Sequence, residues 1–146
     1  MRPTVLLIML IGLVAAACAA PATAEPRIVA ISMTDDMRFV PDTITVAVGE
    51  TIALEVTNDG QIVHEFIVGD EDAQQAHAIE MAEIAADPSA VSSGGHGHDA
   101  EDGGVTVQPG TSAVREYTFD APGTLFIGCH EPGHYEAGMV GTITVE

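Results

Sequence analysis

The sequence predicts an all-β sandwich of about eight short strands, interrupted by one helix-plus-loop insertion. Short apolar runs recur along the chain and are separated by Gly, Pro, Asn and Asp residues, which favour turns. Within several runs the apolar residues alternate with polar ones, which is the period of a strand with one buried face. Short strands at this spacing are typical of a sandwich.

The strands before the insertion are predicted from this alternation. Residues 28–33 and 37–40 form two short apolar runs that end before Pro41. Residues 43–48 and 51–57 then alternate, so each should bury one face. The residues expected on these buried faces are Ile44, Val46 and Val48, followed by Ile52, Leu54 and Val56.

A strong turn signal at residues 58–60 (Asn-Asp-Gly) leads into residues 61–68, which contain His64. The hydrophobic and β-branched residues of this run predict a buried strand. Beyond the insertion, further strands are predicted at residues 105–107, 111–119, 124–129 and 140–145.

Residues 70–104 are predicted to form the insertion. An Ala-, Glu- and Gln-rich segment at residues 73–86 favours a helix, with Asp72 opening a capping box and Pro88 lying beyond its end. We expect this helix to pack on the sandwich through its apolar residues Ile79, Met81 and Ile84. Residues 89–104 are predicted to be a flexible loop rich in Gly and His.

Two histidines of this loop, His96 and His98, lie close in sequence to three acidic residues. Imidazoles on a Gly-rich loop beside carboxylates can bind a divalent ion weakly. They are therefore candidates for an accessory metal site, the alternative being a loop without a metal.

The candidate principal site is the segment from Cys129 to Met139, which contains a thiol, an imidazole at His134 and a thioether. Two imidazoles and a thiolate, with a distant Met sulfur, form the ligand set of blue-copper sites. The missing imidazole should come from the packed body of the domain, and His64 is the candidate. Zinc is the alternative metal, although its N/S sites rarely include Met. His130 should point to the opposite side of the strand.

This pattern resembles the cupredoxin family, which includes plastocyanin and azurin. The segments 63–66 (Val-His-Glu-Phe) and 132–139 (Pro-Gly-His-Tyr-Glu-Ala-Gly-Met) are especially similar to those of small bacterial periplasmic cupredoxins. The resemblance covers residues 28–69 and 105–146 and implies a Greek-key order of the strands. It also implies one type 1 copper per chain, held by His64, Cys129, His134 and Met139.

The sequence departs from plastocyanin and azurin directly after the upstream histidine. An Asn usually stands there and organises the site, whereas this chain has Glu65. By resemblance, the ring edge of His134 reaches the surface and passes the electron.

Residues 1–24 are predicted to be a secretory signal peptide. The positively charged Arg2 precedes an apolar stretch too short to span a membrane comfortably, followed by small residues. Cleavage after Ala24 would leave a single periplasmic domain of residues 25–146, while a lipid-modified Cys18 would anchor it to a membrane. No disulfide is expected, because the sequence has two cysteines and Cys129 is assigned to the metal.

Charge limits the choice of partners. The formal net charge is −18, with 22 acidic residues against 4 basic ones. Nucleic acid and anionic lipid surfaces are therefore expected to be poor partners. Such a charge could attract a basic redox partner, but the acidic residues are spread along the chain, which favours a role in solubility.

The resemblance implies a protein that is not an enzyme. We expect a periplasmic one-electron carrier, acting as a monomer with a redox partner such as a cytochrome or a cuproenzyme. The alternative is a copper-tolerance protein that sequesters or delivers copper. A subunit of a multicopper enzyme is a remote alternative, because another copper centre needs more histidines than a chain with six of them leaves.

Overall fold

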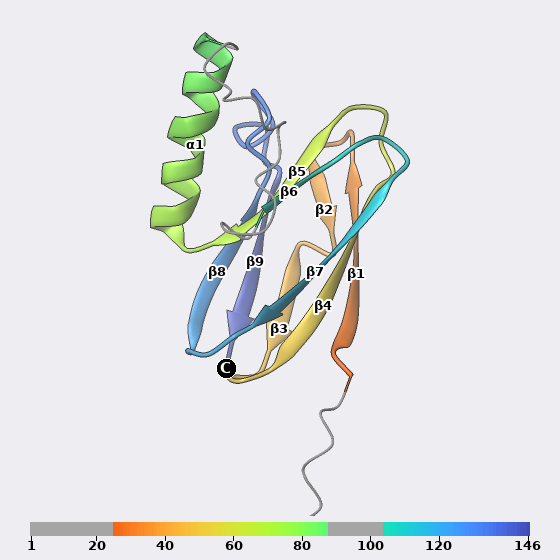
Figure 1. Ribbon diagram of the computed structural model, residues 1–146, viewed down its shortest axis with the longest axis vertical. Coiled ribbons are helices and arrows are strands. Elements are labelled where there is room, and N and C mark those ends of the chain that lie inside the picture. Colours follow the sequence, from red (N-terminus) through yellow and green to blue (C-terminus); the bar gives the residue numbers. More distant parts are fainter. Residues whose placement is uncertain (1–24, 88–103) are drawn as a thin grey trace, which may run out of the picture.

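Two β-sheets face each other in the computed structural model, which describes residues 25–87 and 104–146 (Figure 1). In chain order the elements are β1 (Arg27–Thr34), β2 (Arg38–Val40), β3 (Thr43–Val46), β4 (Thr51–Asn58), β5 (His64–Gly69), α1 (Glu71–Ala86), β6 (Gly104–Val107), β7 (Ser112–Thr118), β8 (Gly123–Gly128) and β9 (Val140–Val145). The described ranges thus form nine strands and one helix, and the predicted Greek-key sandwich with a helical insertion is confirmed.

The chain crosses repeatedly between the two sheets. One sheet has the order β2-β1-β4-β7 and the other the order β3-β9-β8-β5-β6. The β1–β4 and β3–β9 pairs are parallel, and the remaining pairs are antiparallel. Because β5 and β8 are antiparallel neighbours, the start of β5 and the end of β8 lie at the same edge of their sheet.

The core lies between the sheets, as the alternation predicted. Ile52, Leu54 and Val56 on β4 are fully buried. Phe39 of β2 meets Phe66 of β5 edge-to-face, with ring centroids 5.7 Å apart, so aromatic packing connects the two sheets. Ile44 and Val46 are also buried, as expected. The prediction for Val48 was wrong, because β3 ends at Val46 and Val48 is exposed.

Helix α1 lies against the outer side of the five-stranded sheet, beside β5 and β8 (Figure 1). It begins at Glu71 rather than at residue 73, because Asp70, not Asp72, is the N-cap. The Asp70 carboxylate accepts a hydrogen bond of 2.9 Å from the backbone N–H of Ala73. Asp72 instead lies in the first turn, where a negative charge interacts favourably with the helix dipole.

The face by which α1 packs also differs from the expectation. Its buried residues are Gln74 and His77, whereas Ile79 is 53% exposed. Met81 and Ile84 are only half-buried. The reason is that the surface beneath the helix offers polar partners, so the contact is made by hydrogen bonds more than by apolar packing.

Replacing Asp70 with alanine is therefore expected to destabilise the protein by about 0.5–2 kcal/mol, the usual cost of losing an N-cap side chain. The matched control is Asp72→Ala, which removes an acidic residue from the same turn but no cap. Chemical denaturation of both variants checks this, and an equal loss of stability in the two would contradict the assignment of the cap.

The predicted signal peptide with Cys18, and the loop histidines His96 and His98, lie outside the described residues. Across residues 25–87 and 104–146, no helix has the length and apolar character needed to cross a membrane.

Candidate metal centre

Two of the predicted ligands are positioned by the β5–β8 pair. His64 is the first residue of β5, and Cys129 directly follows the last residue of β8. Their antiparallel pairing, with Ile67 opposite Gly128, brings both to the same edge of the sheet. Residues 65 positions apart are thereby placed side by side by the backbone hydrogen bonds of the sheet.

The segment after Cys129 folds back on itself and returns to the same place. The backbone N–H of Cys129 donates to the carbonyl of Met139 at 3.2 Å, and the N–H of Met139 donates to the carbonyl of His134 at 3.0 Å. Gly133 has a φ of +85°, a conformation that favours glycine, so residue 133 allows the turn that returns His134 towards Cys129.

Three donor atoms converge at this edge. His64 Nδ1 lies 3.2 Å from His134 Nδ1, and the Sγ of Cys129 lies 3.3 Å from His134 Nδ1 and 4.0 Å from His64 Nδ1. A metal in the plane of two nitrogens at about 2.0 Å and one sulfur at about 2.3 Å needs donor separations of roughly 3.5–3.7 Å. The three observed separations, 3.2, 3.3 and 4.0 Å, lie on both sides of these values, so the three side chains fit a metal ion.

The thiol of Cys129 is shielded from water. Its side chain is fully buried, and burial raises the pKa of the thiol to about 12. The backbone N–H of Glu65 donates to Sγ at 3.3 Å, and the N–H of Glu131 donates to it as well. These amides favour the thiolate, the form that binds a metal, and oppose part of the effect of burial.

The two imidazoles are held in the neutral form that metals require. Burial is the main cause that lowers the pKa of both His64 and His134. The Nε2 of His64 is buried and lies 3.5 Å from Asp35 Oδ1, which is longer than an ordinary hydrogen bond. With Nδ1 directed to the metal, Nε2 carries the proton and faces this carboxylate, an arrangement that orients many metal-binding histidines.

Asp35 is itself fixed by the backbone of a neighbouring loop. Both of its carboxylate oxygens accept from the N–H of Gln61, at 2.9 and 2.8 Å. This backbone hydrogen bond is the largest of the causes that lower the pKa of Asp35. Sequence reasoning did not identify Asp35, because no motif distinguishes it from the other acidic residues of the chain.

The fourth predicted ligand, Met139, is fully buried next to the other three. Its backbone is hydrogen bonded to both Cys129 and His134, which places residue 139 beside the donor triangle. Binding of a metal by its thioether stays a prediction. Of the His, Cys, Asp and Glu side chains in the described ranges, His64, Cys129 and His134 form the group able to share one ion.

A second group of polar residues lies between α1 and the end of the β5–β8 pair that holds the three donors. It consists of Gln74, His77, Glu65 and His130. His130 points away from the metal triangle, as predicted, and its Nε2 contacts Gln74 Oε1 at 2.7 Å.

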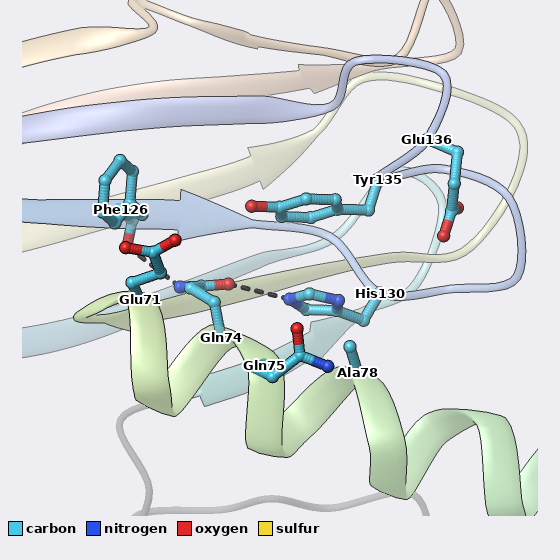
Figure 2. Close-up of a pocket in the computed structure, with 8 residues that line it drawn as sticks. All are labelled: Glu71, Gln74, Gln75, Ala78, Phe126, His130, Tyr135 and Glu136. Carbon is cyan, nitrogen blue, oxygen red and sulfur yellow. Dashed lines mark hydrogen bonds between the residues drawn. The ribbon is translucent and has the colours of Figure 1, made fainter.

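An open groove of about 440 Å³ runs beside this contact, and Figure 2 shows His130 and Tyr135 lining it opposite the helix. Gln74 was missed as a contact residue because its role depends on residues distant in sequence.

Comparison with known families identifies the chemistry of this centre. The model of the copper-binding proteins of the plastocyanin/azurin family matches residues 27–146. The chain is 40% identical over 119 residues to the copper-resistant cuproprotein CopI of Rubrivivax gelatinosus, covering 82% of this chain and 66% of that protein. The CopI of Pseudomonas aeruginosa is 36% identical over 131 residues, with 76% of this chain and 72% of that protein covered. The chain therefore spans about two thirds of the length of these relatives.

Solved structures show the same fold. Reduced auracyanin from the photosynthetic bacterium Roseiflexus castenholzii has a TM-score of 0.66 and 25% identity, with 84% of this chain and 98% of that chain covered. Auracyanin A of Chloroflexus aurantiacus, described as a blue copper protein, has a TM-score of 0.64 and 22% identity, with 83% of this chain and 99% of that chain covered.

Proposed function

Because this chain belongs to the plastocyanin/azurin family of copper-binding proteins, with copper as its cofactor, we propose that it is a periplasmic copper-tolerance protein. One copper ion would be held by His64 Nδ1, Cys129 Sγ, His134 Nδ1 and the thioether of Met139. The observation that carries this proposal is the convergence of three donor atoms within 4.0 Å of one another.

The names of the relatives favour tolerance over electron transfer. The matching proteins from three bacteria, which are 32–40% identical to this chain, are all called copper-resistant cuproproteins. The order of preference expected from the sequence alone is therefore reversed. A protein for tolerance must retain copper, and burial of Cys129 and Met139 would slow the exchange of the ion with water.

The residues of the site suit both common oxidation states of copper. When bound, copper supplies reversible exchange between Cu(I) and Cu(II), and a thiolate and a thioether favour the first state while imidazoles accept both. Cys129 loses its proton on binding, and the N–H groups of Glu65 and Glu131 then donate to the thiolate. The Asp35 carboxylate, 3.5 Å from His64 Nε2, would favour the proton on that nitrogen and so leave Nδ1 free for the ion.

Copper binding is expected to release about one proton per ion at pH 8. The buried thiol, with a pKa of about 12, is protonated before binding and deprotonated afterwards. The imidazoles add no further proton at this pH, because their pKa values lie below the ordinary 6.5. Copper affinity should therefore rise about tenfold per pH unit between neutral pH and the pKa of the thiol. Titration in unbuffered solution measures the proton, and release of none would contradict binding through Cys129.

Growth of a copper-sensitive bacterial deletion strain tests the role in tolerance. Expression of the wild-type chain should restore growth in added copper, and Cys129→Ser should not. The matched control is Ala137→Ser, which places the same hydroxyl at an exposed position of the same loop and should restore growth fully. Equal rescue by Cys129→Ser would contradict the proposal.

A one-electron carrier is the second candidate, and the closeness of the three donors without a metal favours it. Donors that are already in place need little movement when an electron arrives, and this lowers the barrier to transfer. Reversible one-electron cycling with fast exchange to a cytochrome, combined with no effect of the gene on copper tolerance, would favour the carrier instead.

A further inference from the structure

We propose that Gln74, assisted by His77, is a positioning residue that sets the geometry of the metal centre from helix α1. Neither side chain belongs to the group of three donor residues. Each instead contacts a residue directly next to a ligand in sequence, His130 beside Cys129 and Glu65 beside His64. The inference rests on the proposed copper site and adds to it the function of the helical insertion.

Gln74 connects α1 to both ligand-bearing strands. It is 4% exposed, and its Nε2 donates to the carbonyl of Ile67 on β5 at 3.2 Å and to that of Phe126 on β8 at 3.1 Å. Figure 2 shows the amide lying between Phe126 and His130. One buried amide therefore holds the β5–β8 pair and the residue after Cys129 together.

These contacts also determine the tautomer of His130. The two backbone carbonyls can only accept, so the NH₂ group of Gln74 must face them and its Oε1 must face His130. Since Oε1 can only accept, Nε2 of His130 must carry a proton and donate it. Hydrogen bonding thus determines which way the Gln74 amide faces and which nitrogen of His130 carries the proton.

The ring of His130 is confined on a second side by Tyr135. The two rings stack with centroids 4.6 Å apart and an interplanar angle of 13°. The space is also limited at Gly128, where an added Cβ would collide with Gln74 Oε1 and approach His130 Nε2 and Tyr135 Cε2 to 3.0 Å. A side chain at position 128 would therefore displace Gln74, His130 or Tyr135, and glycine avoids this.

His77 provides the second link, on the side of His64. Its Nε2 lies 3.4 Å from Glu65 Oε2, and Glu65 is 2% exposed. The backbone N–H of Glu65 is also the group that donates to Cys129 Sγ. A shift of Glu65 would therefore change both the start of β5 and the hydrogen bond to the sulfur.

Together the two links explain how the site is organised without an Asn at position 65. The residues after His64 and Cys129 are both held by α1, so the spacing of the donors depends on the docking of the helix. A ligand set that is slightly displaced still binds copper, but with lower affinity and a different thiolate-to-copper geometry, which the Cu(II) spectrum reports.

The test compares Gln74→Met with Gln75→Met, since Gln75 is the exposed neighbour on the same helix. Methionine keeps the length of the side chain but removes its hydrogen bonds. We expect Gln75→Met to match the wild type. We expect Gln74→Met to bind one copper with roughly 10- to 100-fold lower affinity and with a changed visible and electron paramagnetic resonance spectrum.

An unchanged spectrum and affinity in Gln74→Met, even with reduced thermal stability, would overturn the inference, because a purely structural role predicts that result. If Gln74→Met does not fold, His77→Gln takes its place, and we expect a smaller spectral change in the same measurements. An unchanged spectrum in His77→Gln would then overturn the inference. If the wild type itself shows no thiolate absorption, the proposed copper site fails instead, so the two failures are distinguishable.

Discussion

Replacing Cys129 with serine is expected to abolish the intense visible absorption of the Cu(II)-loaded protein and most of its copper-dependent stabilisation. The absorption arises from the bond between copper and a thiolate, and a serine hydroxyl is not deprotonated at neutral pH to replace it. With free copper about 1,000-fold above its Kd, the wild type should gain about 4.1 kcal/mol of stability. Spectroscopy and thermal unfolding with and without copper measure both effects.

Ala137→Ser is the control for this substitution, because it adds the same hydroxyl to the ligand loop without removing the thiol. It should keep both the absorption and the gain in stability. Retention of the visible band by Cys129→Ser would show that the sulfur is not a ligand. The burial of this thiol beside two donated N–H groups would then have no role in metal binding.

Phe66→Ala is expected to reduce the free energy of unfolding by about 3–5 kcal/mol, the usual cost of removing a fully buried aromatic ring. Phe66 is 0% exposed and meets Phe39 of the opposite sheet. Phe66 follows His64 by two positions on the same strand, so both side chains point to the same side of the sheet. The cavity would therefore open directly beside the ligand, and copper affinity should fall together with stability.

The control is Phe66→Leu, which keeps most of the buried volume and should cost less. Urea unfolding of the metal-free proteins measures the loss of stability, and a chelator competition measures the affinity. If Phe66→Ala lowered stability but left copper affinity unchanged, the core would not contribute to holding His64 in place.

The strands of the sandwich could be predicted from the sequence, because the alternation of apolar and polar residues is a pattern among residues close together in the chain. The alternation of Ile52, Leu54 and Val56 reflects the period of a strand, and the structure buries all three. The same rule failed at Val48, because alternation does not show where a strand ends. The convergence of His64 with Cys129 was expected from ligand chemistry and family resemblance, and the pairing of β5 with β8 supplies its physical cause.

The helix shows why the remaining features were not predictable. Asp70 and Asp72 are both suitable N-cap residues, and only the backbone conformation after β5 selects Asp70. The packing face was predicted from Ile79, Met81 and Ile84. Gln74 is buried instead, because carbonyls of β5 and β8 and the ring of His130 lie beneath it. These partners are distant in sequence, so a local pattern contains no signal for them.

The same limit applies to Asp35. Its position near His64 depends on the turn after β1 meeting the loop before β5, where it accepts from the backbone of Gln61. Identifying it required the structure, since carboxylates are abundant in this chain and most of those in residues 25–87 and 104–146 are exposed.

X-ray absorption at the copper edge of the loaded protein shows directly whether the rigid β-scaffold gathers His64, Cys129 and His134 around one copper ion. We predict one sulfur at a short distance and two imidazole nitrogens in the first coordination shell, with the sulfur lost in Cys129→Ser. A shell made of nitrogen and oxygen alone, unchanged by that substitution, would contradict this arrangement.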